Sequence, residues 1–314
     1  MQLIEAQDIE QVISFPTLIK ALRQAFSGDF GMPQRQVYHL PGEDGITDAF
    51  AVLPAWNDEV MGVKAFTYLP GNPAKGLDTL SSKLMLFSRT TGAPLALVDG
   101  TVLTYWRTAA ISALAADYLA HPDANSLLLF GAGKLAPYMA LAHASIRPIT
   151  TIYVAGRQPD NIQRTIDKIL EQRPDLSVIA ESDTESRAAQ VDIISCATSS
   201  AEPLFDGKSI QPGTHIDLVG NHNHDCRECD SQSVVNSRCY VDSRINVLNE
   251  AGELLIPIEE RLIDKQHVLG ELAELCAEKV SGRETAEEIT LFKSVGTALS
   301  DLTAAHLVYR LLQG

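Results

Sequence analysis

The sequence predicts an α/β protein with two kinds of sheet, an antiparallel one first and a parallel, doubly wound one after it. Short apolar runs broken by turns fill residues 34–99, a spacing typical of antiparallel strands. From residue 126 onward, apolar runs alternate with helical stretches, as in a parallel sheet flanked by helices. A glycine-spaced turn follows the first of these later runs.

The first part begins with a short strand signal near residue 3 and a helix from Phe15 to Phe26, ended by Gly28. An alanine-rich helix is expected from about Thr108 to Leu119, and His121-Pro122-Asp123 marks a break after it. The apolar runs between these helices predict strands at Gln36–Leu40, Asp48–Pro54, Met61–Tyr68, Lys83–Phe87 and Pro94–Asp99.

Further apolar runs predict the strands of the second part, with helical stretches between the earlier ones. The last segment, Gly296 to Leu312, reads as an alanine- and leucine-rich helix that could return to the first part. The predicted strands are Leu127–Phe130, Thr151–Val154, Leu176–Ile179, Ile193–Cys196, His215–Val219 and Arg238–Val241.

The run Ser126–Phe130 leads directly into Gly131-Ala132-Gly133-Lys134-Leu135-Ala136, the pattern of a Rossmann dinucleotide-binding turn. Gly131 permits the sharp turn, Gly133 lets the backbone approach a pyrophosphate, and Ala136 permits close helix–strand packing. The phosphates would sit at the helix N-terminus, where unpaired N–H groups point outward. An ordinary tight turn is the alternative, but the second strand one helix length later favours the dinucleotide site.

The end of that second strand indicates which dinucleotide is used. An NAD site places Asp or Glu about 20 residues beyond the glycines, on the ribose 2′-hydroxyl. Here the chain reads Gly156-Arg157, with no acid before Asp160. A guanidinium pairs with phosphate oxygens, so Arg157 favours NADPH, with NADH as a weaker cofactor. A solvated loop arginine is the alternative for Arg157.

Length and composition predict a globular chain of two domains, since 45% of its 314 residues are hydrophobic and 21% are charged. Forty Asp and Glu against 25 Lys and Arg leave a formal charge of −15, which disfavours nucleic acid and anionic lipid as partners. No window reaches the roughly 18 apolar residues of a membrane span, and no basic segment followed by an apolar core opens the chain. The expected location is the cytoplasm.

The cysteines give no sign of a disulfide framework, because there are 5 and nothing indicates secretion, so buried reduced thiols are expected. The segment Cys226-Arg227-Glu228-Cys229, preceded by His222 and His224, superficially resembles a zinc site. A second closely spaced pair is missing, although His215 and Cys239 lie within reach in sequence, so no metal is expected.

Phrases spread along nearly the whole chain resemble the ornithine cyclodeaminase/μ-crystallin family. They are Trp106–Ala115, Phe130–Gly133, Leu269–Leu272 and, most specifically, Thr290–Leu302. The resemblance implies a Rossmann-type NADP(H)-binding domain, residues 121–295, inserted into an α+β substrate-binding and dimerisation domain. That second domain would comprise residues 1–120 and 296–314, and the protein would be a homodimer.

Basic residues of the first part match the family's substrate-binding residues. Arg35 and Arg107 match its carboxylate-binding arginines, and a guanidinium fork fixes both the plane and the charge of a carboxylate. Lys64 matches its active-site lysine and stands in an apolar strand, where an ammonium group wants an anionic partner. The resemblance also implies a substrate contact by Thr79. The alternatives are a loop charge for Arg35, a helix-start cap for Arg107 and the solvent face of an edge strand for Lys64.

His222 departs from the cyclodeaminases of the family, which place an aspartate two residues after the glycine that is Gly220 here. An imidazole can donate a proton to an imine nitrogen or hold a water that does so, and packing beside the nicotinamide is the alternative. The residues that the resemblance implies for cofactor binding are Thr108, Gly131, Ala132, Gly133, Lys134, Leu135, Gly156, Arg157, Ala197, Thr198, Val219 and His222.

These features together predict an oxidoreductase that reduces a cyclic imino acid with NADPH. The expected reaction converts Δ1-pyrroline-2-carboxylate to L-proline, with Δ1-piperideine-2-carboxylate giving L-pipecolate as a second substrate. Lys64 and His222 are the catalytic candidates, since both can support protonation of the imine nitrogen. An ornithine cyclodeaminase, an alanine dehydrogenase and a non-catalytic NADPH-dependent binding protein of the μ-crystallin type stay open as alternatives.

Overall fold

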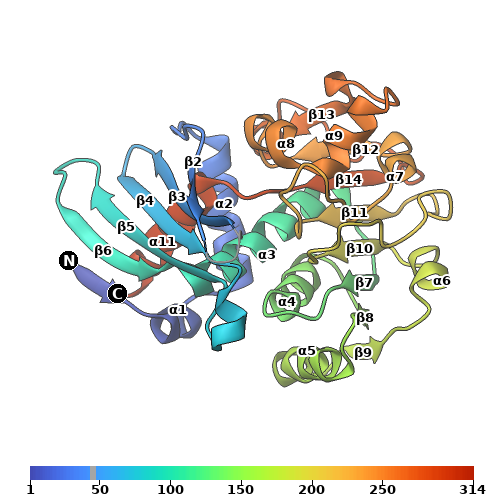
Figure 1. Cartoon of the computed structure of the whole chain (residues 1–314), viewed down its shortest axis with the longest axis horizontal. Helices are drawn as coiled ribbons and strands as arrows, with labels where there is room; N and C mark the ends of the chain where they lie inside the picture. The colour runs from blue at the N-terminus through green and yellow to red at the C-terminus, as the bar shows by residue number, and fades with distance from the viewer. Residues whose placement is uncertain (43–46) are drawn as a thin grey trace. The chain divides into compact units, whose positions relative to one another are not determined.

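The computed structural model describes residues 1–42 and 47–314. Residue contacts divide the chain into two compact units, Met1–Arg107 with Thr297–Gly314, and Thr108–Gly296. Each unit contains one sheet (Figure 1). The division falls inside helix α3 (Gly100–Leu119), whereas the sequence placed a domain boundary after residue 120. The roles assigned to the two domains stay a prediction.

The first unit is built on a six-stranded sheet. Among the described strands of this sheet, only β1 and β6 pair in parallel, and the other neighbours are antiparallel, as the turn-broken apolar runs predicted. Two helices precede the second strand in the chain, α1 (Ala6–Val12) and α2 (Phe15–Ser27). In spatial order the strands are β1 (Gln2–Ile4), β6 (Pro94–Asp99), β5 (Leu80–Ser88), β4 (Val60–Tyr68), β3 (Thr47–Trp56) and β2 (Gln36–Pro41).

Helix α11 (Ala298–Leu311) packs against β3, β4 and β5 and against α2. In the β4–β5 register Lys64 faces Leu84 and Gly62 faces Leu86, so these residues share one face of the sheet. A Cβ atom on Gly62 would lie 2.9 Å from the Leu302 side chain of α11, which identifies this face as the one that α11 covers. The C-terminal helix therefore returns to the first unit.

Helix α3 begins at Gly100, so the predicted start at Thr108 is wrong. Strand β6 ends at Asp99, whose Oδ1 accepts hydrogen bonds from the backbone N–H groups of Thr101 (3.0 Å) and Val102 (2.9 Å). This carboxylate satisfies two N–H groups of the first helical turn, so strand and helix follow each other without a loop. The sequence predicted a connecting segment between the strand that ends at Asp99 and the helix, but the structure has none.

The second unit is an eight-stranded sheet in which every strand pair is parallel, as predicted. The order reverses between β7 and β10, since β8 and β9 lie beyond β7 and the remaining strands lie beyond β10. In spatial order the strands are β13 (Val268–Glu271), β12 (Arg238–Val241), β14 (Thr290–Lys293), β11 (His215–Leu218), β10 (Ile193–Cys196), β7 (Ser126–Phe130), β8 (Thr151–Ala155) and β9 (Ser177–Ala180).

Two of these strands, β13 and β14, were not predicted. Strand β13 contains a glycine and ends in a glutamate, and β14 ends in a lysine, so neither reads as an apolar run. The helices of this unit are α4 (Ala136–Ile146), α5 (Pro159–Gln172), α6 (Thr184–Ala188), α7 (Ser231–Val235), α8 (Arg244–Glu250), α9 (Gly252–Glu259) and α10 (Leu272–Cys276). Short 3-10 helices lie at Asn72–Lys75 in the first unit and Lys265–His267 in the second.

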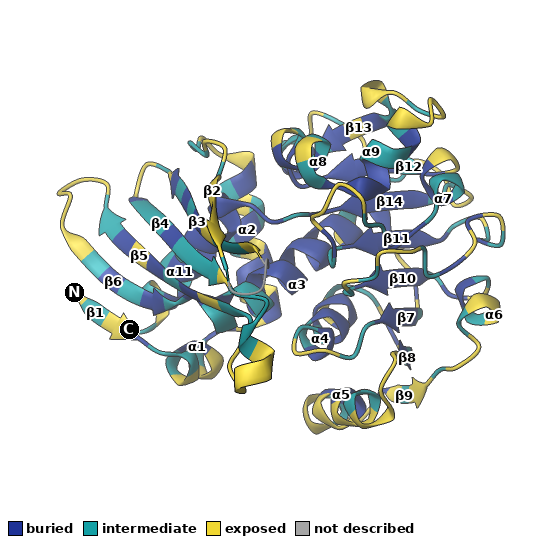
Figure 2. Cartoon of the chain, in the orientation of Figure 1, coloured by how far each residue is buried: buried dark blue, intermediate teal, exposed yellow. Residues whose placement is uncertain are grey.

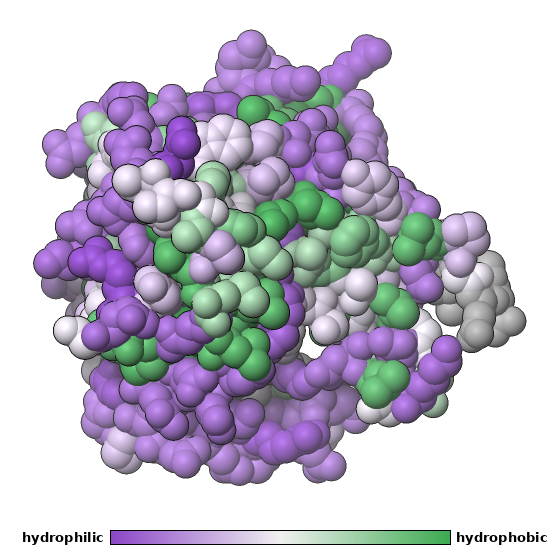
Figure 3. All heavy atoms as spheres, turned by 90° about the vertical axis from the view of Figure 1, so that its left-hand side faces the viewer, coloured by the Kyte–Doolittle hydropathy of each residue, from purple (hydrophilic) through white to green (hydrophobic). Residues whose placement is uncertain are grey.

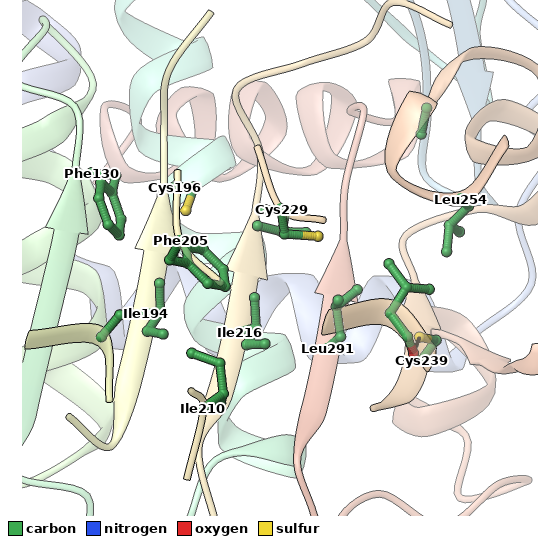
Figure 4. Packing of buried hydrophobic residues seen from close by; sticks show 14 of the residues in the cluster. Phe130, Ile194, Cys196, Phe205, Ile210, Ile216, Cys229, Cys239, Leu254 and Leu291 are labelled. Atoms are coloured by element: carbon green, nitrogen blue, oxygen red, sulfur yellow. Dashed lines mark hydrogen bonds between the residues drawn. The ribbon is translucent and has the colours of Figure 1, made fainter. Parts of the chain in front are cut away.

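The central parallel strands are buried along their whole length (Figure 2). Strands covered on both faces are expected to be continuously apolar, which is how β10 was recognised in the sequence. An apolar cluster lies beside them and includes Phe130, Cys196, Phe205 and Cys229 (Figure 4). All five cysteines are free, and four of them are buried. No helix in the described ranges is long and apolar enough to cross a membrane.

Candidate active site

Lys64 lies in the middle of β4, between β3 and β5, and its side chain is only 4% exposed. Lys64 therefore does not lie on the solvent face of an edge strand, which was the alternative interpretation. Its Nζ lies 3.0 Å from Oδ1 of Asp301 on α11 and 2.5 Å from Oγ1 of Thr104 on α3. Asp301 is the anionic partner that an ammonium group in an apolar strand requires.

Arg107 binds the same carboxylate oxygen. Its Nε donates to Oδ1 of Asp301 over 2.9 Å, and the Asp301 side chain is 1% exposed. Since Arg107 lies well inside α3, the helix-start cap considered for it is wrong. The second oxygen of Asp301, Oδ2, is buried and has no hydrogen-bond partner in the described part of the chain. The three side chains form what we call the Lys64–Arg107–Asp301 cluster.

The pKa values of Lys64 and Asp301 are both shifted from their ordinary values, for different reasons. Burial lowers the pKa of Lys64 to about 8; the Asp301 charge opposes this shift, while the charges of Arg107 and Arg35 add to it. Burial alone would raise the pKa of Asp301, but the charges of Arg107 and Lys64 prevail and hold it below its ordinary value. Asp301 is therefore a carboxylate at neutral pH, whereas Lys64 gains or loses its proton at a pH near 8.

Arg35 and Thr79 belong to the same unit and are half-buried. The charge of Arg35 acts on Lys64, as stated above. Thr79 lies just before β5, and its carbonyl oxygen accepts a hydrogen bond from the N–H of Leu69 over 2.8 Å. The described hydrogen bonds do not join Thr79 to the Lys64–Arg107–Asp301 cluster.

Sequence reasoning missed Asp301, although the family-like phrase Thr290–Leu302 contains it. The available signal was that Asp301 is the only acidic residue between Gly296 and Leu312, in a helix otherwise rich in alanine and leucine. A lone carboxylate on such a helix is buried with it and therefore needs a cationic partner.

In the second unit, the glycine turn after β7 bends sharply and borders open space. Gly131 adopts a φ of +112°, and a Cβ there would lie 2.6 Å from the carbonyl oxygen of Ala197, so only glycine fits. A Cβ on Gly133 would meet nothing within 4 Å, so the backbone ahead of α4 borders open space. Lys134 and Leu135 complete the turn before α4 begins at Ala136. A helix N-terminus of this kind is a favourable place for a phosphate group.

Arg157 is the second residue after the end of β8, the strand that pairs with β7. A Cβ on the preceding Gly156 would lie 3.0 Å from the Cβ of Ala132, so the two strand-end loops touch. The Arg157 side chain is exposed, and no hydrogen bond or ion pair joins it to residues 1–42 or 47–314. Its guanidinium is therefore available to an anionic ligand.

Other predicted cofactor residues follow β10 and β11, the strands that continue from β7 away from β8. Ala197 and Thr198 come directly after β10, and Val219 and the exposed His222 come after β11. In parallel sheets the carboxyl ends of neighbouring strands form one edge, which is where open α/β sheets bind ligands. Thr108, by contrast, is buried in α3.

A buried glutamate joins two of these strand-end loops. Glu228 accepts hydrogen bonds from the N–H (2.7 Å) and Oγ1 (2.8 Å) of Thr198 at one oxygen and from the N–H of Gly220 (2.8 Å) at the other. Burial raises the pKa of Glu228, an effect that Lys293 opposes and Glu253 reinforces. Sequence reasoning did not find this residue, because it treated the segment only as a possible metal motif.

A buried ion pair adjoins this glutamate. Nζ of Lys293, the last residue of β14, lies 2.9 Å from Oε1 of Glu253 on α9 and donates to the carbonyl oxygen of Asn221 over 2.7 Å. The same Oε1 accepts the N–H of Glu228 over 3.2 Å. Both side chains of the pair are 0% exposed.

The two cysteines of the segment Cys226–Cys229 lie in different surroundings. Cys229 packs in the apolar cluster (Figure 4), while Cys226 is half-buried. Burial raises the pKa of the Cys229 thiol well above its usual range. Within residues 1–42 and 47–314, no group of three or more His, Cys, Asp or Glu side chains could hold a metal ion.

Fold and site together define a class: an α/β protein whose second unit has a parallel, Rossmann-type sheet and whose first unit holds a buried lysine–arginine–aspartate cluster. The chain belongs to the ornithine cyclodeaminase/mu-crystallin family, whose model matches residues 3–314.

Relatives and solved structures agree with this assignment. A Δ1-pyrroline-2-carboxylate reductase of Colwellia psychrerythraea is 50% identical over 310 residues, covering 98% of each chain. The structure of a Thermococcus litoralis Δ1-pyrroline-2-carboxylate reductase in complex with NADH and L-proline is 34% identical, with a TM-score of 0.93 over 100% of this chain and 98% of the other. An archaeal alanine dehydrogenase dimer with bound NAD is 26% identical, with a TM-score of 0.90 over 100% and 96%.

Proposed function

We propose that the protein reduces the cyclic ketimine Δ1-pyrroline-2-carboxylate to L-proline with NADPH, and Δ1-piperideine-2-carboxylate to L-pipecolate as a second substrate. The observation that carries this proposal is the buried Lys64–Arg107–Asp301 cluster, in a chain 50% identical to a Δ1-pyrroline-2-carboxylate reductase over 98% of its length. A lysine with a pKa of about 8 beside a fixed arginine suits a substrate with a basic nitrogen and a carboxylate.

Arg107 and Arg35 bind the substrate carboxylate in this proposal. The bond from Nε of Arg107 to Asp301 fixes the plane of the guanidinium, and Nη1 and Nη2 pair with the carboxylate oxygens. Oδ2 of Asp301, which is buried without a partner in the described ranges, remains as an acceptor for an N–H of the substrate or product. Thr79 is a further candidate contact.

Lys64 and His222 are the candidates for protonating the imine nitrogen. Nζ of Lys64 exchanges a proton near neutral pH, because burial lowers its pKa to about 8. His222 lies exposed in the loop after β11 and would act from the side of the cofactor. A cyclodeaminase would have an aspartate at His222, which argues against ornithine as the substrate.

The cofactor, when bound, supplies the hydride for the imine carbon, and the protein contributes orientation and charge. The turn Gly131–Leu135 would hold the pyrophosphate, and the guanidinium of Arg157 would pair with a 2′-phosphate, which favours NADPH over NADH. Residues Ala197, Thr198 and Val219 would line the nicotinamide end, with Thr108 as a further contact.

We further propose that the protein is a homodimer formed through the first sheet. On the face opposite α11, Tyr38 is 49% exposed, Phe50 is 37% exposed and Met85 is 36% exposed. Apolar side chains gather on the side of the molecule that carries this sheet (Figure 3). Such a patch is typical of a protein interface. Sedimentation should give twice the chain mass, and Phe50→Lys should give the single chain mass.

The cytoplasmic location stays a prediction.

A panel of substrates tests the proposed reaction. Steady-state rates would be measured with both cyclic imines, with pyruvate plus ammonia and with ornithine, each with NADPH and with NADH. We expect the two imines to be reduced and NADPH to be preferred. Ammonia release from ornithine with NAD would identify a cyclodeaminase instead. Cofactor binding without any turnover would indicate a binding protein.

A further inference from the structure

Glu228 links the carboxyl ends of β10 and β11, and the proposed reaction gives it no role. Its two carboxylate oxygens accept three hydrogen bonds, from the N–H and Oγ1 of Thr198 and from the N–H of Gly220. The loops are in close contact there, because a Cβ on Gly220 would overlap the backbone of Thr198 and Oε1 of Glu228. One side chain therefore holds the two loops at a fixed separation.

All three donors require an acceptor, and only a carboxylate offers one at both oxygens. Lys293 and Glu253 fix the same region from the other side, since Nζ of Lys293 bonds both Oε1 of Glu253 and the carbonyl oxygen of Asn221. Asn221 is the residue between Gly220 and His222. Buried ionic groups are a poor source of stability, because desolvation offsets much of their attraction. Positional control of the loops is the better explanation for this arrangement.

We propose that Glu228 is a positioning residue that sets the nicotinamide-binding edge of the second sheet. By fixing Thr198 against Gly220 it holds the loops that carry Ala197 and His222 in one arrangement. The inference rests on the proposed function, because it takes these loops as the nicotinamide side of the cofactor site. It also accounts for the segment Cys226–Cys229, in which Cys229 anchors the chain in the apolar cluster beside the carboxylate.

The test is Glu228→Gln, which keeps the size of the side chain but replaces one acceptor oxygen with an NH2 donor. Each oxygen of Glu228 accepts a backbone N–H, from Thr198 or from Gly220, so that donor would face an N–H group and the two loops should separate. We expect the Kd for NADPH, from fluorescence titration without substrate, and kcat to worsen by on the order of 10- to 100-fold. The KM for Δ1-pyrroline-2-carboxylate should stay within about twofold, because Arg35 and Arg107 belong to the other unit.

Asp192→Asn is the matched control. Oδ2 of Asp192 also accepts three hydrogen bonds, from the N–H of Asn125 (2.9 Å) and from the N–H (3.0 Å) and Oγ (2.7 Å) of Ser126. It joins the amino ends of β7 and β10, at the opposite edge of the same sheet. We expect this variant to lower Tm without changing the Kd for NADPH.

The outcomes separate the two proposals. An unchanged Kd and kcat in Glu228→Gln, alongside an active wild-type protein, would overturn the positioning role alone. A wild-type protein that binds neither NADPH nor NADH would overturn the proposed function and the inference with it. Should Glu228→Gln not fold, Glu228→Asp keeps the charge but withdraws the carboxylate by one methylene, and the same split between Kd and imine KM is expected.

Discussion

Lys64 and Asp301 form a buried ion pair, Nζ to Oδ1 over 3.0 Å, although 237 positions separate them in the sequence. The pair joins the middle of β4 to the first turn of α11. The Lys64 ammonium would be costly in this place without the Asp301 carboxylate, which Arg107 also binds. The stability of the first unit and the chemistry proposed for Lys64 therefore depend on one contact.

Asp301→Asn should lower the stability of the protein and change the pH at which Lys64 loses its proton. Removing one partner of a buried ion pair typically costs about 3–5 kcal/mol, which urea unfolding would detect. Without the carboxylate, the positive charges of Arg107 and Arg35 would lower the pKa of Lys64 further, so the pH profile should shift to lower pH. Asp175→Asn, which removes an exposed pair with Arg173, is the control and should change stability little. Equal effects of the two substitutions would contradict the pairing.

Reduction of the imine should weaken above a pH of about 8. Burial lowers the pKa of Lys64 to about 8, so Nζ is charged below that pH and neutral above it. If the charged form protonates the imine, kcat/KM for reduction falls above this pH, and oxidation of L-proline rises over the same range. Lys64→Arg keeps its charge, so its residual activity should lack this limb. A limb that persists in Lys64→Arg belongs to another group.

Arg157→Asp should reverse part of the cofactor preference. Loss of a charge-assisted bond to the 2′-phosphate removes roughly 1.5–3 kcal/mol, so kcat/KM with NADPH should fall relative to that with NADH. Arg164→Ala, on the exposed face of α5, is the control and should leave the ratio unchanged. If the NADPH/NADH ratio is the same in both variants, Arg157 is not the discriminator.

His222→Ala should slow the reductive step while leaving the Kd for NADPH nearly unchanged. General acid assistance is typically worth about 10²–10⁴-fold, so a loss below about threefold would leave His222 with a packing role only. His224→Ala, an exposed neighbour that pairs with Asp225 and Glu259, is the control. His222→Asp should not create ammonia release from ornithine, because the pocket must also accept a long ammonium side chain.

Acid should destabilise the second unit through His215, whose Nδ1 lies 2.9 Å from Oγ1 of Thr290. Burial lowers the pKa of His215 to about 3, although the charge of Asp217 opposes this shift. The unfolded chain, with a histidine pKa near 6.5, binds the proton first. The free energy of unfolding should thus fall from pH 6.5 downward, by at most about 1.4 kcal/mol per pH unit from this group.

His215→Asn tests this dependence by urea unfolding at several pH values. The variant should be less stable at pH 7 but should lose less stability between pH 6.5 and pH 4. His39→Asn, at an exposed position of β2, should keep the slope of the wild-type protein. A slope unchanged in His215→Asn would assign the acid sensitivity elsewhere.

Most of the fold follows from local sequence patterns. Apolar runs predicted the strands from β2 to β12, and the glycine turn after β7 requires a positive φ that glycine alone adopts readily. The two missed strands show the limit of such patterns, because β13 and β14 each end in a charged residue and depend on their neighbours in the sheet.

The candidate site could be predicted only in part, because its charged residues depend on distant partners. Lys64 was recognisable as an ammonium group in an apolar strand, but its partner lies on the last helix. Glu228 and Lys293 are likewise buried only because Glu253 and the loop after β11 surround them. Composition around a charged residue indicates that a partner is needed, but not which residue supplies it.

The return of α11 to the first sheet has a consequence for biosynthesis. The parallel unit is one contiguous segment, residues 108–296, so it can fold during translation. The first unit cannot be completed until residues 297–314 have emerged from the ribosome. Until α11 arrives, the inner face of β3, β4 and β5 is uncovered and Lys64 has no counter-ion from Asp301. The nascent chain is therefore most exposed to aggregation and to chaperones at its earliest-made sheet.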